Sequence, residues 1–288
     1  MASDRYLLDN AVPAAGPRLD ALAELFDPST FRHVTALGIA RGWRCWEVGA
    51  GGPSVARWLA DQVGPAGHVL ATDLDVSWAH AAARDNVEVR RHDVAVDPPP
   101  GSPPGSPPGP AFDLVHARLV LVHVAERERA LRSMVAAVRP GGWLLVEDAD
   151  PALQPLACLE ADRPEHVLAN HLRTTFRALL AERGADLAFG RKLPRLLRAA
   201  GLRDVAADAQ FPVVHPACAR LERKTIEHVR DRLLASGRAT RAEIDEHLAN
   251  LDAGTVDIVT SPMISAWGRR PESAPDGLIR RTEVIRDG

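Results

Sequence analysis

The stretch Cys45–Leu59 most constrains the fold of this chain, because an apolar strand runs there through a glycine turn into an amphipathic helix. Gly49 and Gly51 allow the backbone to approach a ligand without an intervening Cβ atom, and Pro53 suits the first position of a helix. We therefore expect a cofactor to lie on this turn. An ordinary tight turn between a strand and a helix is the alternative.

The residues around the turn distinguish between two classes of cofactor. A dinucleotide fold requires a third glycine, in the pattern G-x-G-x-x-G, where this chain has Ser54. Glu47 stands two residues before the first glycine, where its carboxylate would repel a pyrophosphate but suit a cationic ligand. The turn therefore favours an amino group over phosphates. It resembles the first motif, E/D-x-G-x-G-x, of class I S-adenosylmethionine-dependent methyltransferases.

Two carboxylates follow at the ends of the next predicted strands. The strand 68–73 ends in Asp73, about 20 residues beyond the glycine turn, which is where a nucleotide-binding fold places a ribose. A short strand within 87–94 reaches Asp93, which the resemblance assigns to the adenine amino group, with Val94 and Leu74 flanking the ring. Either carboxylate could instead cap the helix or turn that follows its strand.

Later motifs extend the resemblance over residues 43–148. They are the runs Phe112–Arg118 and Leu131–Asp148, the second with the stop signal Arg139-Pro140-Gly141-Gly142 before a fifth strand. The resemblance implies S-adenosylmethionine as the cofactor. The residues that it places at the cofactor are Tyr6, Glu47, Gly49, Gly51, Asp73, Leu74, His92, Asp93, Val94, Ala117 and Arg118.

The resemblance also implies an α/β fold. Amphipathic patterns before and after the matching region add N-terminal helices and an inserted helical cap. The centre of the fold would be a Rossmann-like seven-stranded sheet of order 3-2-1-4-5-7-6 with the last strand antiparallel. The expected parts are an N-terminal helical segment or lid at 1–41, a cofactor-binding core at 42–151, a cap insertion at 152–189, and the end of the core at 190–288 with a second helical insertion at 216–258. The N-terminal helices could simply pack on the core. The insertions could likewise be extra core or an oligomer interface.

Local patterns add two further expectations. Leu19, Leu22 and Phe26 predict one helix, and Asp27-Pro28 predicts the start of a second. Residues 97–110 form a proline-rich loop of low complexity. Its Asp97-Pro98-Pro99 is similar to the D/N-P-P-Y/F motif of amino-directed methyltransferases, but that motif follows the fourth strand and this one precedes it. Methylation of N6-adenine or glutamine therefore loses support.

The expected chemistry is transfer of a sulfonium methyl group by in-line displacement, so the protein mainly aligns the acceptor. His123, just beyond the fourth strand, is the candidate base, and a packed core histidine is the alternative. Glu147 is the second catalytic candidate. With Asp148 it could orient an amine or hydroxyl, or both could cap a turn. We expect a small-molecule acceptor under the helical cap, methylated on oxygen, nitrogen or carbon, and no metal.

Composition bears on partners and location. The 35 basic and 38 acidic residues leave a net charge of −3, so no global field recruits nucleic acid or an anionic membrane. Three widely spaced cysteines, and no apolar stretch approaching about 18 residues, predict a cytoplasmic protein without a membrane span. By analogy with stand-alone bacterial enzymes, we expect a tailoring reaction of secondary metabolism such as antibiotic biosynthesis. A homodimer is compatible with the chain.

Two other functions stay open on the sequence alone. An NAD-type oxidoreductase is disfavoured by Ser54 and Glu47. An S-adenosylmethionine-binding protein that does not methylate, either a scaffold or a cyclase or isomerase, would carry the same cofactor motifs.

Overall fold

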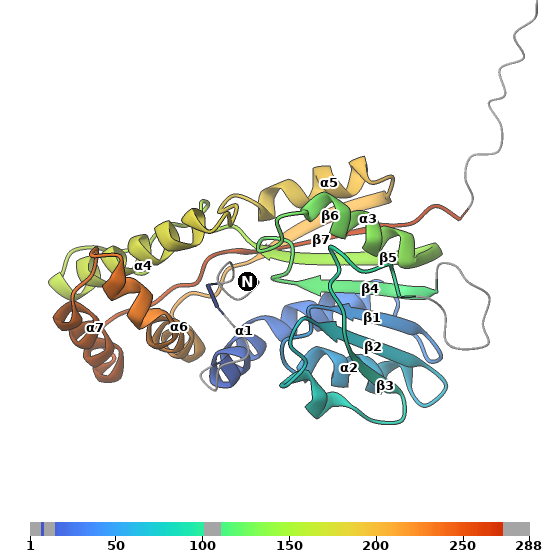
Figure 1. Ribbon diagram of the computed structural model, residues 1–288, viewed down its shortest axis with the longest axis horizontal. Coiled ribbons are helices and arrows are strands. Elements are labelled where there is room, and N and C mark those ends of the chain that lie inside the picture. The colour runs from blue at the N-terminus through green and yellow to red at the C-terminus, as the bar shows by residue number, and fades with distance from the viewer. Residues whose placement is uncertain (1–6, 9–14, 101–110, 273–288) are drawn as a thin grey trace, which may run out of the picture.

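A seven-stranded sheet forms the centre of the computed structural model, which describes residues 7–8, 15–100 and 111–272 (Figure 1). The strands follow the order β3-β2-β1-β4-β5-β7-β6, and β7 runs antiparallel to both of its neighbours. This arrangement confirms the predicted sheet. The strands are β1 (Arg44–Val48), β2 (His68–Asp73), β3 (Val87–Arg91), β4 (Phe112–Arg118), β5 (Val138–Ala149), β6 (Arg203–Gln210) and β7 (Met263–Arg269).

Helices cover both faces of the sheet, so its central strands are apolar on both sides. One face packs against α3 (Arg127–Ala137) and α5 (Leu193–Ala199), with Trp46 of β1 buried there. The opposite face packs against α2 (Ser54–Val63), with Cys45 of β1 buried there. Short 3₁₀ helices at Ala79–Ala82 (η1) and Gly190–Lys192 (η2) complete the connections.

The N-terminal segment forms one helix, α1 (Ala15–Ala36), and not the two that the sequence predicted. Pro28 lies inside it, although proline has no N–H to donate to the preceding turn. Tertiary packing on both sides of Pro28 holds the helix together. Phe26 packs in a cluster with the later helices, and Phe31 stacks on Trp58 of α2 with ring centroids 4.3 Å apart.

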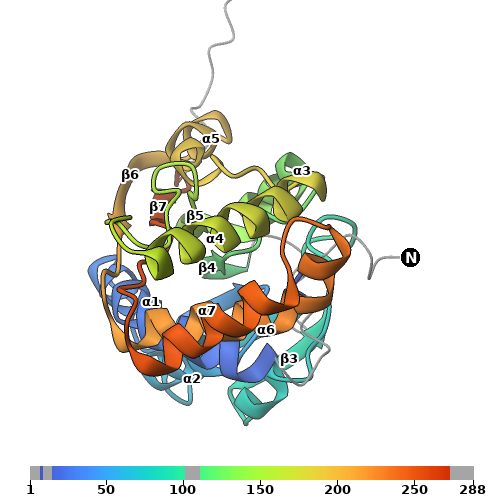
Figure 2. The ribbon, with the colours of Figure 1, turned by 90° about the vertical axis from the view of Figure 1, so that its left-hand side faces the viewer.

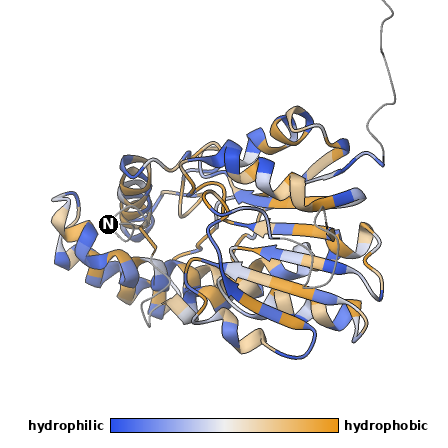
Figure 3. Ribbon diagram, turned by 45° about the vertical axis from the view of Figure 1, so that its right-hand side comes forward, coloured by the Kyte–Doolittle hydropathy of each residue, from blue (hydrophilic) through white to orange (hydrophobic). Residues whose placement is uncertain are grey.

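Three later helices gather with α1 beyond one end of the sheet (Figures 1 and 2). They are α4 (Pro164–Glu182), α6 (Pro216–Ala235) and α7 (Arg241–Ala253). Hydrophobic and hydrophilic residues share each helix (Figure 3), and their apolar sides meet through Leu172, Ile226 and Val229. α6 also lies against α1. These helices fall within 152–189 and 216–258, and their role as a substrate cap stays a prediction.

Some sequence predictions fall outside the described residues. Tyr6 is one, and residues 101–110 of the proline-rich loop are another. No helix in the described part of the chain is both long and apolar enough to cross a membrane.

Candidate functional site

The turn after β1 needs glycine at two positions. Gly49 has φ +64° and Gly51 has φ +56°, in the left-handed region that side chains disfavour. A Cβ atom on Gly49 would lie 2.4 Å from Cγ2 of Val120, and one on Gly51 would lie 3.1 Å from Cδ2 of Leu19 in α1. The turn therefore brings bare backbone against the segment after β4 and against α1.

Asp73 ends β2 beside this turn. Its Oδ2 accepts a hydrogen bond of 2.9 Å from the amide of Gly51, and its Oδ1 accepts one of 3.2 Å from the amide of Asp75. Burial raises the pKa of Asp73, although these amides counteract it. The structure thus shows Asp73 tying the glycine turn to β2, where ribose hydroxyls would find a desolvated acceptor. Its contact with a ligand stays a prediction.

The expected adenine contacts lie at the ends of β2 and β3. Asp93 accepts a hydrogen bond of 2.9 Å from the amide of Ala95, so it caps its own turn. Val94 is buried, and His92 is buried with its Nε2 2.9 Å from the carbonyl of Pro98. Leu74 is 57% exposed at the end of β2. An apolar ligand ring would cover it.

Glu47 does not lie open to a ligand as the sequence suggested. It is 2% exposed, and its Oε2 lies 2.5 Å from Nδ1 of His116 on the neighbouring strand β4. The other ring nitrogen of His116 lies 3.2 Å from Oε2 of Glu147 on β5. The histidine therefore bridges two buried carboxylates from two different strands.

The bridge continues across the sheet to α1 and β6. Nδ1 of His33 in α1 lies 3.4 Å from Oε1 of Glu147, and its Nε2 lies 2.8 Å from Oδ1 of Asp208 on β6. Thr30 of α1 donates a hydrogen bond to Glu147. We name the set Glu47, His116, Glu147, His33 and Asp208 the charge row, because negative and positive groups alternate along it.

The charge row shifts the pKa values of its two histidines and of Glu147. Burial opposes a charged His116, but Glu47 and Glu147 overcome this and raise its pKa to about 9. Burial likewise opposes a charged Glu147, yet its two histidine partners hold its pKa well below the usual range. The pKa of His33 is raised by Glu147 and Asp208 against the effect of its burial. Each charge is thus supported by the next one in the row.

The two catalytic candidates lie in different surroundings. Glu147 is 1% exposed, and besides its partners in the charge row it accepts a hydrogen bond of 2.5 Å from Ser265. Its neighbour Asp148 is also fully buried, and this burial raises its pKa well above the usual range. His123 lies in the turn after β4, where burial and then the nearby Arg18 and Arg127 lower its pKa to about 4. It is therefore neutral near pH 7, as a base must be, although weakly basic.

The remaining predicted cofactor residues lie at the end of β4. Ala117 is buried in the core between the sheet and α3. Arg118 turns toward α1, where it donates to Oδ1 of Asp27 at 2.8 Å and to Oγ1 of Thr30 at 3.0 Å. Arg118 thus fastens α1 to the sheet, which sequence reasoning had not suggested.

Sequence reasoning also missed the partners that complete the charge row. A signal existed for His116, because Glu47 and His116 stand near the ends of adjacent parallel strands and share one register position. No comparable signal existed for His33 and Thr30, because a helix carries no register with a strand. Within residues 7–8, 15–100 and 111–272, no group of three or more His, Cys, Asp or Glu side chains is arranged to hold a metal ion.

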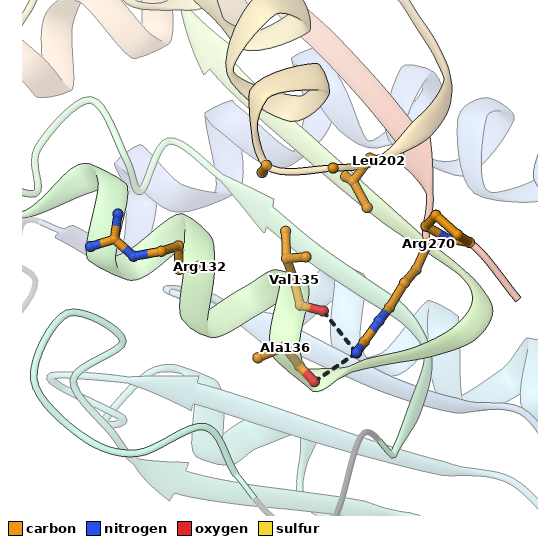
Figure 4. Close-up of a pocket in the computed structure, with 8 residues that line it drawn as sticks. Arg132, Val135, Ala136, Leu202 and Arg270 are labelled. Carbon is orange, nitrogen blue, oxygen red and sulfur yellow. Dashed lines mark hydrogen bonds between the residues drawn. The ribbon is translucent and has the colours of Figure 1, made fainter. Parts of the chain in front are cut away.

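Two surface cavities lie away from the glycine turn. One, of about 400 Å³, is where β7 ends, and Arg270 there donates hydrogen bonds to the carbonyls of Val135 and Ala136 at the end of α3 (Figure 4). The other, of about 480 Å³, lies between α3 and α5. The Arg270 side chain thus satisfies carbonyls in the last turn of α3.

Comparisons with known proteins agree with this geometry. A family model for a methyltransferase domain matches residues 46–144. Methyltransferase str2 of Strobilurus tenacellus is 30% identical over 133 residues, which cover 46% of this chain and 45% of that protein. The ubiquinone/menaquinone biosynthesis C-methyltransferase UbiE of Vibrio parahaemolyticus is 30% identical over 129 residues, covering 43% and 48%. The chain thus spans about half the length of these curated relatives.

A solved structure matches over more of the chain. The YcgJ protein of Bacillus subtilis aligns with a TM-score of 0.51 at 16% identity, covering 86% of this chain and 100% of that one. That likeness shows the fold. Together with the domain match, it confirms the resemblance of the core to class I S-adenosylmethionine-dependent methyltransferases, whose cofactor is S-adenosylmethionine.

Proposed function

We propose that this chain, with its core of the class I methyltransferase type, binds S-adenosylmethionine on the turn between β1 and α2 and transfers its methyl group to a small-molecule acceptor. The observation that carries the proposal is the pairing of Gly51 with Asp73, which sets a desolvated carboxylate beside a glycine turn. The bound donor would supply an activated methyl group on its sulfonium.

The residues present fit an adenosine ligand. Asp73 would accept hydrogen bonds from the ribose hydroxyls, and Asp93 from the adenine amino group. The exposed Leu74 would pack on the ring. Gly49 and Gly51 let the turn adopt its left-handed backbone, with Val120 and Leu19 packed where Cβ atoms would stand.

The acceptor would lie between the carboxyl ends of the strands and the helices α4, α6 and α7. We expect a partly apolar acceptor, methylated on oxygen, nitrogen or carbon. His123 would take the acceptor's proton where one must leave. A tailoring reaction of bacterial secondary metabolism, a cytoplasmic location and a homodimer remain part of this proposal.

Calorimetry tests the donor. The full chain is titrated with S-adenosylhomocysteine and, separately, with NADH. We expect saturable binding of S-adenosylhomocysteine and none of NADH, and the reverse result would refute the proposal. Candidate acceptors are then incubated with S-adenosylmethionine. Conversion of an acceptor without release of S-adenosylhomocysteine would mean that the chain does not methylate.

A further inference from the structure

We propose that His116 is a positioning residue for the donor site: as an imidazolium it holds Glu47 at the base of the glycine turn and, through Glu147, fastens α1 over that turn. The inference rests on the proposed function, because the ligand positioned is its methyl donor. It concerns binding of that donor, since nothing in the geometry brings His116 to the acceptor.

The geometry favours a charged ring between two ionised carboxylates. Nδ1 of His116 faces a carboxylate oxygen of Glu47, and Nε2 faces one of Glu147. A neutral imidazole carries one N–H, so it could donate to only one of the two carboxylates. The ring is fully buried, which leaves no solvent to replace the missing donor.

Glu47 and Glu147 contact the ring directly, and a wider network of groups from neighbouring elements is linked to them or lies close by. The charged and titratable groups are Glu47 on β1, Arg118 on β4, Glu147 on β5, Asp208 on β6, and Asp27 and His33 on α1, and the polar ones are Thr30 on α1 and Ser265 on β7. Glu147 is the centre of this set, because its oxygens meet His116, Thr30, Ser265 and His33. Removing the charge of His116 would leave Glu47 and Glu147 without the cation between them.

The same helix that the charge row holds also covers the donor turn. Thr30 and His33 of α1 contact Glu147. Asp27, which lies one to two turns earlier in α1, is bound by Arg118 of β4. Further toward its start, Leu19 packs on Gly51, 3.1 Å from where a Cβ atom would lie. His116 is thus linked to the glycine turn by two routes. One runs through Glu47 along β1, and the other runs through Glu147 and α1.

The consequence is a donor site that depends on one proton. At a pH below the usual pKa of histidine, the His116 ring is charged in both the folded and the unfolded protein, and the charge row is intact. As the pH rises through about 9 the folded ring loses its proton, and Glu47 and Glu147 then repel one another or turn away. Donor binding should weaken over that interval.

The test compares full-length wild type with His116→Gln, a neutral residue of similar length. Affinity for S-adenosylhomocysteine is measured by calorimetry from pH 6.5 to 10, and hydrogen exchange of α1 is followed without ligand. We expect His116→Gln to weaken binding at pH 7 by about tenfold or more and to speed exchange in 15–36. The amino group of the ligand loses its proton over the same pH range with either protein. A loss of affinity above pH 8 that the wild type shows and His116→Gln does not therefore reports on His116.

His166→Asn is the matched control. His166 is a buried histidine of α4 whose Nδ1 lies 2.9 Å from Asp162, remote from the charge row. It should leave donor affinity and α1 exchange unchanged. If His116→Gln does not fold, the double variant Glu47→Gln/His116→Gln replaces it, because this variant also removes one of the two carboxylates. The double variant should bind S-adenosylhomocysteine without the wild-type change in affinity near pH 9.

The outcomes separate the two proposals. If the wild type does not bind S-adenosylhomocysteine, the proposed function fails. If it binds, and His116→Gln or the double variant shows wild-type affinity with the wild-type pH step, then the positioning role is overturned while the proposed function stands. Equal weakening by His166→Asn would also overturn it, since any buried histidine would then have the same effect.

Discussion

The amide of Gly51 donates a hydrogen bond of 2.9 Å to Oδ2 of Asp73, joining the glycine turn to the end of β2 across 22 residues of sequence. The carboxylate therefore has a structural partner before any ligand arrives. Its second oxygen is bonded more loosely, at 3.2 Å to the amide of Asp75. A ligand with hydroxyl groups would share this carboxylate with the turn rather than displace the turn.

Asp73→Ala should therefore weaken binding of S-adenosylhomocysteine strongly. A charged acceptor to hydroxyl groups contributes on the order of 1.5–3 kcal/mol, and the glycine turn would lose its anchor as well. Calorimetry measures the loss, and circular dichroism checks that the variant folds. Asp73→Asn, which keeps the shape but not the charge, should lose less. Unchanged affinity in both would remove Asp73 from the ligand site.

Gly49→Ala should cost more stability than the same change at Gly38. Both residues have positive φ, but a Cβ atom on Gly38 meets nothing within 4 Å, whereas one on Gly49 would lie 2.4 Å from Val120. The backbone strain is thus common to both variants, and the additional loss, about 1–3 kcal/mol, measures the clash. Urea unfolding compares the two. Equal losses would show that the segment after β4 yields easily.

The melting temperature should fall at alkaline pH because of His116. Its pKa is raised from 6.5 to about 9, so its contribution is fully present below pH 6.5 and is lost as the pH rises through about 9. The contribution is on the order of 3 kcal/mol, from the free energy of each pKa unit. Calorimetric melts between pH 6 and 10 should show this decline in the wild type. In His116→Gln the decline should be smaller.

Arg173→Met should destabilise the helices α4, α6 and α7. Arg173 lies 2.6 Å from Glu222, and both are buried. Although burial opposes it, Arg173 holds the pKa of Glu222 at about 2. Without Arg173, the charged partner left to this buried carboxylate among the described residues would be His247, 3.6 Å away. We expect a cost of about 3–5 kcal/mol.

The pH dependence of this pair runs opposite to that of His116. Because the pKa of Glu222 is depressed, this carboxylate stabilises the folded state above pH 4.5. That stabilisation is lost as the pH falls through about 2. The double variant Arg173→Met/Glu222→Leu, which buries neither charge, should recover much of the stability in urea unfolding. A double variant as unstable as Arg173→Met would mean that packing, and not the charge, explains the loss.

Local pattern was enough to place the strands and the glycine turn. The strand predicted at 68–73 is β2, and the glycine turn, Asp73 and Asp93 follow the strands as expected because parallel strands end at one edge of the sheet. These features depend on residues near one another in the chain. The order of the sheet was implied by the resemblance to class I methyltransferases, and the structure confirms it.

Tertiary structure alone decided what the polar residues do. Glu47 and Glu147 were predicted as ligand and catalytic residues, and the tertiary structure adds their partners. β4 brings His116 to Glu47 from 69 positions away, and α1 brings Thr30 to Glu147 from 117 positions away. The same packing carried α1 unbroken through Pro28. The helix propensity of one residue changes the free energy of folding by about 1 kcal/mol, or by about 3 kcal/mol for proline. Leaving a buried charge without a partner costs several times as much as an unfavourable propensity. The partner comes from whichever segment the fold brings near.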